Sequence, residues 1–381
     1  MQPLLDLVQQ ARAEAEGELA RQLQICNACR YCEGFCAVFP AMTRRLSFPY
    51  ADIHYLANLC HQCGACLHAC QYAPPHEFAV SLPRAMARVR GRTYVEFAWP
   101  PRFARLYERN GLTLALALVA ALAFFLVLAL VRQGAGPGAL WGAVPQGSFY
   151  ALFPHGLLVA LFAPVFLFAV LALGVGVMRF WRGVDGGEPH AAAMAEAARD
   201  VLRMKYLDGG HGLGCPNESD RFTLARRRLH QFTMHGFGLC FAATVVATLY
   251  HYGLGLPAPY GWTTLPKVLG TLGGLGLIIG TVGLWRLRQR RDPAMVEPAQ
   301  KAMDEGFIAL LFLTGASGLA LALARTAPAM PLLLCLHLAS VLALFLTMPY
   351  GKFAHGVYRG AALLKWAIER RQPNRLTLGS E

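Results

Sequence analysis

The same spacing of four cysteines occurs twice within the first 70 residues. The first run is Cys26, Cys29, Cys32 and Cys36, and the second run is Cys60, Cys63, Cys66 and Cys70. Three closely spaced thiolates followed by a fourth are typical of [4Fe–4S] ligands, and in two-cluster ferredoxins the fourth cysteine of each run binds the other cluster. We therefore expect one cluster on Cys26, Cys29, Cys32 and Cys70, and another on Cys60, Cys63, Cys66 and Cys36.

Two other uses of these cysteines fit the pattern less well. Zinc would take four ligands arranged in two pairs instead of a doubled run. Disulfides need an oxidising compartment, whereas the charge distribution considered below places this segment in the cytoplasm. No proline directly follows Cys36 or Cys70, and Pro40 and Pro74 come a few residues later. This departure bears on the fold around the clusters more than on the clusters themselves.

The chain as a whole is too apolar for an ordinary soluble enzyme. Of its 381 residues, 55% are hydrophobic and 15% are charged, a balance that indicates membrane-spanning segments. The formal charge of +13 is typical of cytoplasmic loops in such a protein, not of a nucleic-acid interface. Outside the two runs, Cys240 and Cys335 should be small buried residues. Cys215 lies in a glycine-rich loop, where an ordinary loop role is favoured over a redox or partner contact.

Six apolar stretches are each long enough to cross about 30 Å of hydrocarbon. They cover residues 112–131, 153–178, 232–252, 265–285, 306–324 and 330–350. Glycines repeat along the fourth stretch, which favours close packing against another helix. Arginine and lysine concentrate in alternate connecting segments and outside both ends of the set, which places these segments and both termini in the cytoplasm. The sequence thus predicts a mainly α-helical, multi-pass protein of the bacterial inner membrane.

The expected domain organisation follows from these patterns. Residues 1–80 should comprise an N-terminal helix over 2–24 and a two-cluster ferredoxin-like domain, with a connecting helix at 48–59. Residues 81–110 should form a basic juxtamembrane arm that faces anionic lipid. Residues 111–360 should form a six-helix transmembrane, cytochrome b-like bundle with a cytoplasmic loop at 179–229. Residues 361–381 should form a cytoplasmic tail.

Histidine is the titratable residue that enters the apolar stretches, which contain no Asp or Glu. The residues are His155, His235, His251 and His337, with His230 and His355 at the margins. Without carboxylates the sequence gives no relay for an ion pump. One such histidine is often a hydrogen-bonded interior residue, but the whole set beside iron–sulphur clusters favours haem b with paired histidine ligands.

Helical geometry indicates how these histidines could pair. His337 and His355 are eighteen residues apart, so a continuous helix would carry both on one face. The expected pairs are His251 with His337 at an outer haem, where His155 competes with His251, and His355 with His230 or His235 at an inner haem. The pattern also allows one haem instead of two.

Three stretches that flank or enter the membrane carry a resemblance to a known family. They are RRRLHQFTMHGF at 226–237, TLYHY at 248–252 and MPYGKFAH at 348–355. With the doubled cysteine run and the six apolar stretches, they resemble the tricarballylate-utilisation 4Fe–4S membrane proteins of the TcuB or CitB type. The membrane part is more distantly similar to the cytochrome b subunit of respiratory nitrate reductase. The resemblance implies a partner FAD-dependent tricarballylate dehydrogenase, which forms cis-aconitate and whose electrons this chain passes to the quinone pool.

The leading hypothesis is electron transfer from the flavin of a partner, through two [4Fe–4S] clusters and haem b, to a membrane quinone. Quinone reduction would then be the chain's own reaction. We expect the quinone pocket near Tyr350, Lys352 and His355, although Tyr350 and Lys352 are also typical of an interfacial anchor pair. The alternative is a haem-free membrane anchor that docks a dehydrogenase. A redox sensor would need an output segment, and a nucleotide enzyme would need a strand–glycine loop–helix unit, neither of which we identify.

Overall fold

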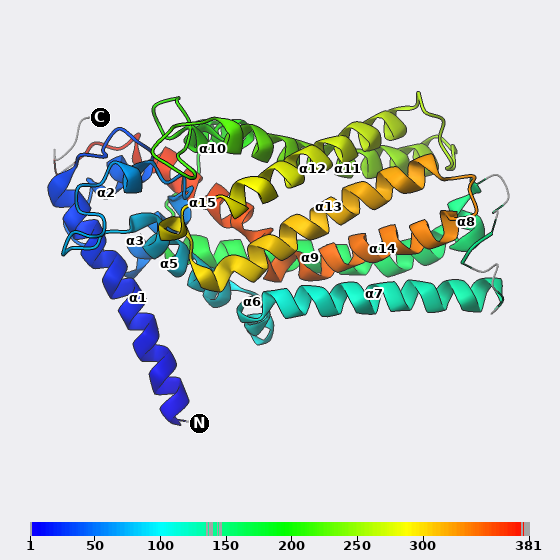
Figure 1. The fold of residues 1–381 in the computed structure, drawn as a ribbon, viewed down its shortest axis with the longest axis horizontal. Coiled ribbons are helices and arrows are strands. Elements are labelled where there is room, and N and C mark those ends of the chain that lie inside the picture. The colour runs from blue at the N-terminus through cyan, green and yellow to red at the C-terminus, as the bar shows by residue number, and fades with distance from the viewer. Residues whose placement is uncertain are drawn as a thin grey trace.

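The structure is a computed structural model that describes residues 2–374 and 376, apart from 135, 137–139, 143 and 145–146, with the backbone alone for residues 2–12. Apart from an isolated bridge between Cys215 and Thr223, these residues form helices, turns and loops without strands. Long helices lie side by side in an elongated bundle, and a smaller helical domain sits at one end of it (Figure 1). The predicted mainly α-helical class is confirmed.

The long helices correspond to the six predicted apolar stretches. They are α7 (Asn110–Gln133), α9 (His155–Gly183), α11 (Ala225–Gly253), α12 (Leu265–Gln289), α13 (Lys301–Leu323) and α14 (Met330–Thr347). Each is part of a segment long and apolar enough to cross a membrane. Large apolar side chains such as Leu116, Val127, Leu171 and Leu272 are exposed, as expected where lipid replaces water around the bundle. The protein is therefore a multi-pass membrane protein.

Helices α11 and α12 approach each other closely through glycine. A Cβ atom on Gly273 would lie 2.7 Å from the backbone nitrogen of Cys240, and one on Gly236 would lie 2.7 Å from that of Leu277. No side chain fits at such distances, so the two backbones meet only because these positions are glycine. The prediction that glycines in the fourth apolar stretch allow close helix packing is confirmed.

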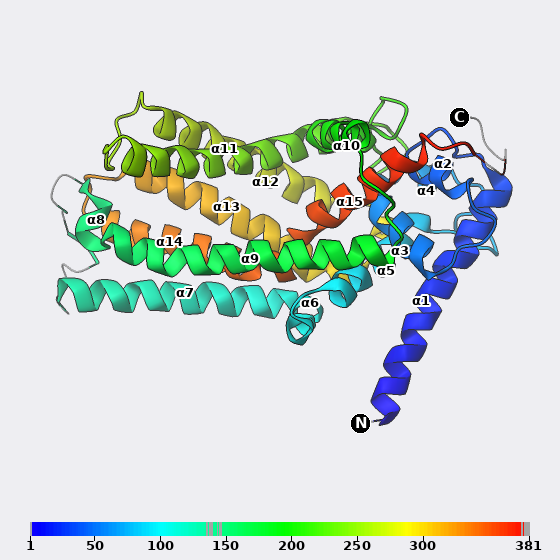
Figure 2. The same ribbon diagram turned by 180° about the vertical axis from the view of Figure 1, so that it is seen from behind.

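The smaller domain is built mainly from the first hundred residues. Its helices are α1 (Gln2–Cys29), α2 (Val38–Met42), α3 (Tyr50–Leu59), α4 (Ala65–His68) and α5 (Leu82–Phe97). Two later helices, α10 (Ala191–Arg203) and α15 (Ala354–Glu369), lie at the same end of the molecule. Helix α15 packs against α3, α9 and α10 (Figure 2). Helix α15 therefore forms part of the same domain as helices from the first hundred residues.

Short helices connect the longer elements. They are η1 (Pro101–Phe103), α6 (Arg105–Glu108), α8 (Phe149–Leu152), η4 (Lys205–Asp208), η5 (Pro293–Met295), η6 (Pro298–Gln300) and η7 (Met348–Tyr350). The first of them follow α5 and lead into α7, so the cysteine domain joins the bundle without a long linker.

Two segments differ from the expected domain organisation. The basic segment 81–110 is not an arm that faces lipid, because its helix α5 packs against α1, α3 and α9 and buries Arg90 and Tyr94. Residues 361–369 are not part of a free tail, because they belong to α15 and bury Leu363 and Trp366. Both helices carry an apolar face, and burial of that face against the domain outweighs the exposure that their charged residues suggest.

The sixth membrane helix does not continue to His355. Helix α14 ends at Thr347, the 3₁₀ helix η7 follows, and α15 begins only at Ala354. Pro349 lacks a backbone donor and Gly351 adopts an extended conformation, which together end the helix. The prediction that His337 and His355 share one face of a continuous helix is therefore wrong.

Candidate functional site

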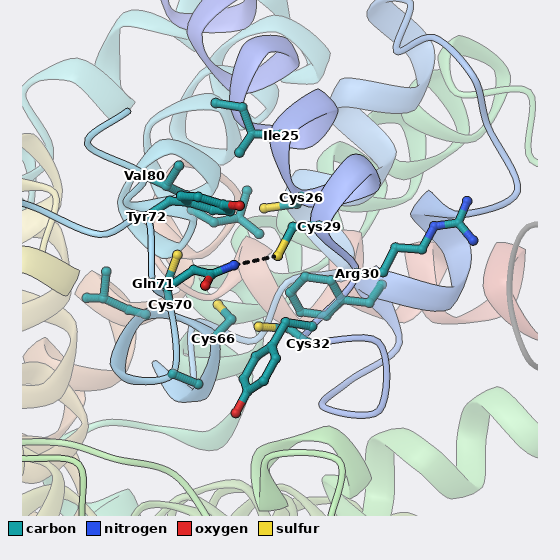
Figure 3. Close-up of a pocket in the computed structure, with 15 residues that line it drawn as sticks. Ile25, Cys26, Cys29, Arg30, Cys32, Cys66, Cys70, Gln71, Tyr72 and Val80 are labelled. Atoms are coloured by element: carbon teal, nitrogen blue, oxygen red, sulfur yellow. Dashed lines mark hydrogen bonds between the residues drawn. The ribbon is translucent and has the colours of Figure 1, made fainter. Parts of the chain in front are cut away.

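The first cysteine cavity lies where α1 meets the segment after α4. It is lined by Cys26, Cys29, Cys32, Cys66 and Cys70, whose thiols surround a common space (Figure 3). Cys26 and Cys29 occupy the last turn of α1, which extends beyond Gln24, the predicted end of this helix. Arg30 then adopts a φ of 57°, and the resulting turn brings Cys32 to the same cavity. The other walls are largely apolar.

The second cysteine cavity is lined by Cys36, Cys60, Cys63 and Cys66. Cys60 ends α3, and the following loop has left-handed backbone at Gln62 (φ 54°) and Gly64 (φ 89°). This loop points the backbone N–H of Gln62 at Cys60 Sγ, 3.3 Å away. Cys36 therefore lies beside cysteines of the second run, and Cys70 lies beside cysteines of the first run. In two-cluster ferredoxins the fourth cysteine of each run likewise binds the cluster of the other run.

The two cysteine cavities adjoin each other. Cys66, Phe39 and Leu82 line both of them. Cys66 belongs by sequence to the second run, and its position between the cavities places the two sets of thiols side by side. Groups bound in the two cavities would therefore lie close together.

The chemistry of the thiols fits an iron–sulphur cluster. Burial, with a smaller effect from neighbouring thiols, raises the pKa of Cys26 and of Cys32 to about 12. Such thiols ionise only beside a cation, which the irons of a cluster supply. No three His, Cys, Asp or Glu side chains of the described residues converge on one metal ion, and none of the eleven cysteines forms a disulfide. Ligands to separate irons of one cluster need not converge in that way.

A third cavity, the histidine cavity, lies between the cysteine domain and the membrane bundle. Its lining includes Gln62, Arg226, His230, Arg288, Arg291, Asp304, Lys352 and His355. The ring centroids of His230 and His355 are 6.0 Å apart. His355 Nδ1 bonds the backbone oxygen of Lys352, which fixes this ring and leaves Nε2 available. His230 Nδ1 is buried without a hydrogen-bond partner.

Charged groups surround this pair of histidines. Lys352 Nζ lies 2.6 Å from Asp304 Oδ1. Arg288 Nη1 lies 2.7 Å from Asp304 Oδ2, and Arg288 Nε lies 3.5 Å from Glu305 Oε1. Burial lowers the pKa of Lys352 to about 8, although Asp304 opposes the change. Burial, together with Arg359 and Lys352, also lowers the pKa of His355 well below its usual value. A neutral imidazole is the form that binds a metal.

The other predicted histidines are arranged differently. His155 and His251 stack with their ring centroids 4.0 Å apart, and the Tyr252 hydroxyl lies 3.5 Å from His155 Nδ1. His337 Nδ1 is 3.1 Å from the hydroxyl of Ser317. His235 is exposed on α11 and lines none of the three cavities. The structure thus brings together His230 with His355 and His155 with His251, and gives no contact between His251 and His337.

The predicted quinone residues are only partly together. Lys352 and His355 line the histidine cavity. Tyr350 is buried, and its hydroxyl donates to the backbone oxygen of Trp99 at 3.0 Å. Its hydroxyl is therefore occupied in joining the bundle to the segment after α5.

Several residues near the cavities have no distinct signal in the sequence. They are Gln62, Arg90, Cys215, Arg226, Arg291 and Arg359. Cys215 is buried beside Cys63, and its thiol donates to the oxygen of Leu207 at 3.1 Å. A hydrogen bond with Cys215 is the largest cause that lowers the pKa of Cys63 to about 6. The favoured sequence interpretation of Cys215, as an ordinary loop residue, misses this contact because it depends on two segments 150 residues apart.

Residues 19–96 match the family described as Citrate utilization protein B Fer4-like domain, and residues 105–375 match Citrate utilization protein B. These matches and the structure define a helical, multi-pass membrane protein with an N-terminal iron–sulphur domain of the ferredoxin type. No solved structure matches.

One curated relative is similar to this protein over nearly its whole length. Citrate utilization protein B of Escherichia coli is 55% identical over 374 residues, which are 98% of this chain and 98% of that protein. The chain belongs to the citrate utilization protein B family. The resemblance on which the sequence analysis relied is therefore confirmed, together with the ferredoxin-like character of the N-terminal domain.

Proposed function

We propose that the protein carries electrons from a partner flavoprotein, through two [4Fe–4S] clusters and haem b, to the membrane quinone pool. One observation carries this proposal, namely that three cavities adjoin in a row. Cys66 lines both cysteine cavities, and Gln62 lines both the second cysteine cavity and the histidine cavity. Groups bound in these cavities would form a continuous route from the cysteine domain to the membrane bundle.

The eight cysteines are the proposed cluster ligands. One set is Cys26, Cys29, Cys32 and Cys70, and the other is Cys36, Cys60, Cys63 and Cys66. When bound, the clusters and the haem carry single electrons, which lets them accept the two electrons of a reduced flavin one at a time. The amide of Gln71 donates to Cys29 Sγ at 3.7 Å (Figure 3) and the backbone of Gln62 donates to Cys60 Sγ. These donors orient thiolates and stabilise their negative charge.

The partner would dock beside the first cysteine cavity. Tyr31 lines this cavity and is 69% exposed, so the cavity reaches the protein surface. We propose an FAD-dependent dehydrogenase of the tricarballylate type as the partner, with its substrate bound by the partner alone. The arginine-rich segments at 179–182, 226–228 and 286–291 lie at the end of the bundle that carries the cysteine domain (Figure 1). This placement supports a cytoplasmic cysteine domain in a bacterial inner membrane.

Haem b would be held by His230 and His355. Their ring centroids are 6.0 Å apart and both residues line the histidine cavity, so these two imidazoles would be able to bind the iron of one haem. His230 has an unpartnered buried nitrogen, and His355 is fixed through Lys352. This pair supports one haem better than two, because His155 and His251 stack on each other with their ring centroids 4.0 Å apart and His337 lies beside the Ser317 hydroxyl.

The quinone would bind in the same region. Lys352 and Asp304 form an ion pair on the wall of the histidine cavity. An ammonium group there can donate a hydrogen bond to a quinone oxygen and stabilise its developing negative charge. Tyr350 is not part of this proposal, since its hydroxyl bonds Trp99.

A haem-free anchor that docks a dehydrogenase is the second candidate function. Its support is that His155 stacks on His251 and that His337 Nδ1 lies 3.1 Å from the Ser317 hydroxyl, so these histidines contact protein groups. His251 Nδ1 itself has no hydrogen-bond partner among the described residues. If His230 and His355 are also structural residues, electrons would leave the second cluster directly for quinone.

The spectrum of the purified protein tests both functions. We expect reduced haem b bands above a broad cluster absorbance, with about eight non-haem irons per chain, as two [4Fe–4S] clusters require. His355→Ala should remove most of the haem and keep the non-haem iron, since a proposed haem ligand is lost and all eight cysteines remain. Pyridine haemochrome and iron assays on the same sample measure the two cofactors separately.

His235→Ala is the matched control, because this exposed histidine lies on the same helix as His230. It should leave the haem content unchanged. An unchanged haem content in His355→Ala would exclude His355 as a ligand. A wild-type protein that contains clusters and no haem would establish the anchor function instead.

A further inference from the structure

Four arginines converge on the loop that carries Cys60 and Cys63. Arg90 donates to the backbone oxygen of Cys60 at 2.7 Å, and Arg359 donates to the same oxygen at 3.1 Å. Arg226 and Arg291 both donate to the backbone oxygen of Gln62. The four side chains come from α5, α11, α15 and the segment after α12, so the bundle and the cysteine domain both contribute them.

These positive charges have no carboxylate partner among the residues that the structure describes. The nearby Lys352 and Arg288 pair with Asp304 and Glu305, whereas the contacts of the four arginines are to backbone oxygens and to the amide of Gln62. Arg90 is 2% exposed.

Two of these four guanidinium groups lack hydrogen-bond partners at one nitrogen. Nε of Arg291 and Nε of Arg359 are buried without a hydrogen-bond partner. Excess positive charge in a poorly hydrated site indicates that an anionic group belongs beside it.

The first cysteine cavity has a different electrostatic environment. The arginine on its wall is Arg30, whose Nε donates to the oxygen of Asn27 at 3.1 Å. Its guanidinium group points away from the thiols in Figure 3. The two sets of cysteines are therefore similar in ligands but differ in the positive charge that surrounds them.

We propose that Arg90, Arg226, Arg291 and Arg359 raise the reduction potential of the cluster bound by the second cysteine set above that of the cluster bound by the first. A cluster with four thiolates becomes more negative on reduction, and nearby buried positive charge stabilises the reduced form most. An electron supplied by the partner's flavin then moves from the first cluster, which is oxidised, to the second, which is reduced. The inference rests on the proposed function, because it requires clusters in both cavities.

Redox titration of the full-length protein, followed by electron paramagnetic resonance, tests the inference. Arg359→Gln removes one charge and keeps donor groups, whereas Arg359→Lys keeps the charge. We expect Arg359→Gln to lower the reduction potential of the second-set cluster by about 59 mV. For a one-electron couple, this shift changes the equilibrium distribution of an electron between the two clusters about tenfold. Arg359→Lys should keep that potential near the wild-type value. Arg291→Gln, in the segment after α12, should lower the same reduction potential. It tests the inference independently if a variant of Arg359 fails to fold.

Arg179→Gln is the matched control. Arg179 also donates to a backbone oxygen, that of Ala98 at 2.8 Å, but lines none of the three cavities, so both potentials should stay unchanged. Unchanged potentials in both Arg359→Gln and Arg291→Gln, or equal falls of both potentials, would overturn the inference. A wild-type protein without two clusters would instead contradict the proposed function, and iron analysis before titration separates these results.

Discussion

Cys36→Ser should remove about half of the cluster iron, and the cluster that is lost should be the same one that Cys63→Ser removes. Cys36 belongs by sequence to the first run but lines the second cavity with Cys60 and Cys63. Serine is a poor substitute for a thiolate ligand, and a [4Fe–4S] cluster needs four ligands. Iron and acid-labile sulphide analysis gives the amount lost, and electron paramagnetic resonance identifies which signal disappears.

Combinations of variants make this result specific for the exchange between runs. The double variant Cys36→Ser with Cys63→Ser should lose no more iron than either single variant. Cys36→Ser with Cys29→Ser should lose both clusters, because Cys29 lines the other cavity. If Cys36→Ser removes the same signal as Cys29→Ser, the exchanged assignment is incorrect and each run holds its own cluster. Cys335→Ser is the control, because Cys335 is buried on the membrane helix α14. This variant should keep all of the iron.

Glu369→Ala should lower the free energy of unfolding by about 3 kcal/mol, the lower end of the cost of removing one partner from a buried ion pair, because this pair is mostly but not fully buried. Glu369, on α15, pairs with Arg45 and Lys365 and accepts a hydrogen bond from Tyr55 at 3.1 Å. Arg45 and Glu369 are 12% and 16% exposed at their side chains, so removal of the carboxylate leaves positive charge in a poorly hydrated site. Loss of cluster absorbance during thermal or denaturant unfolding measures the effect.

Glu18→Ala provides the comparison for this substitution. Glu18 also pairs with an arginine, Arg21, but their side chains are 41% and 44% exposed. Exposed pairs of this kind contribute less than about 1 kcal/mol. A loss of stability in Glu369→Ala no larger than that in Glu18→Ala would show that α15 is not held to the cysteine domain by this network.

The sequence is informative wherever one local pattern determines the outcome. The apolar stretches predict the six membrane helices because burial in lipid acts on each stretch independently. The glycines along α12 likewise predict close contact with another helix, and the structure shows that this helix is α11. The family matches confirm the ferredoxin-like domain that the doubled cysteine run predicts. The assignment of individual cysteines and histidines remains a prediction, which the geometry supports for His230 and His355 and supports less for His251 and His337.

The sequence predictions that the structure contradicts concern features that depend on contacts between distant segments. The α5 arginines suggest a lipid-facing arm, but Arg90 instead bonds the oxygens of Ala57 and Cys60 in the cysteine domain. Spacing alone places His337 and His355 on one helix, but Pro349 and Gly351 interrupt it. The arginines around Gln62 come from four separate segments, so no local pattern could predict that they meet.

The position of α15 has a consequence for how the protein is made. Domains generally fold as units, and N-terminal domains do so first while a chain is being synthesised. Here Tyr55 and Arg45 acquire their partner Glu369 only after more than 300 further residues, including all six membrane helices, have been translated. The cysteine domain of a growing chain therefore lacks the helix that packs against α3 until α15 has been synthesised. Stable retention of iron by this domain should accordingly be a late event, confined to chains in which α15 has been translated.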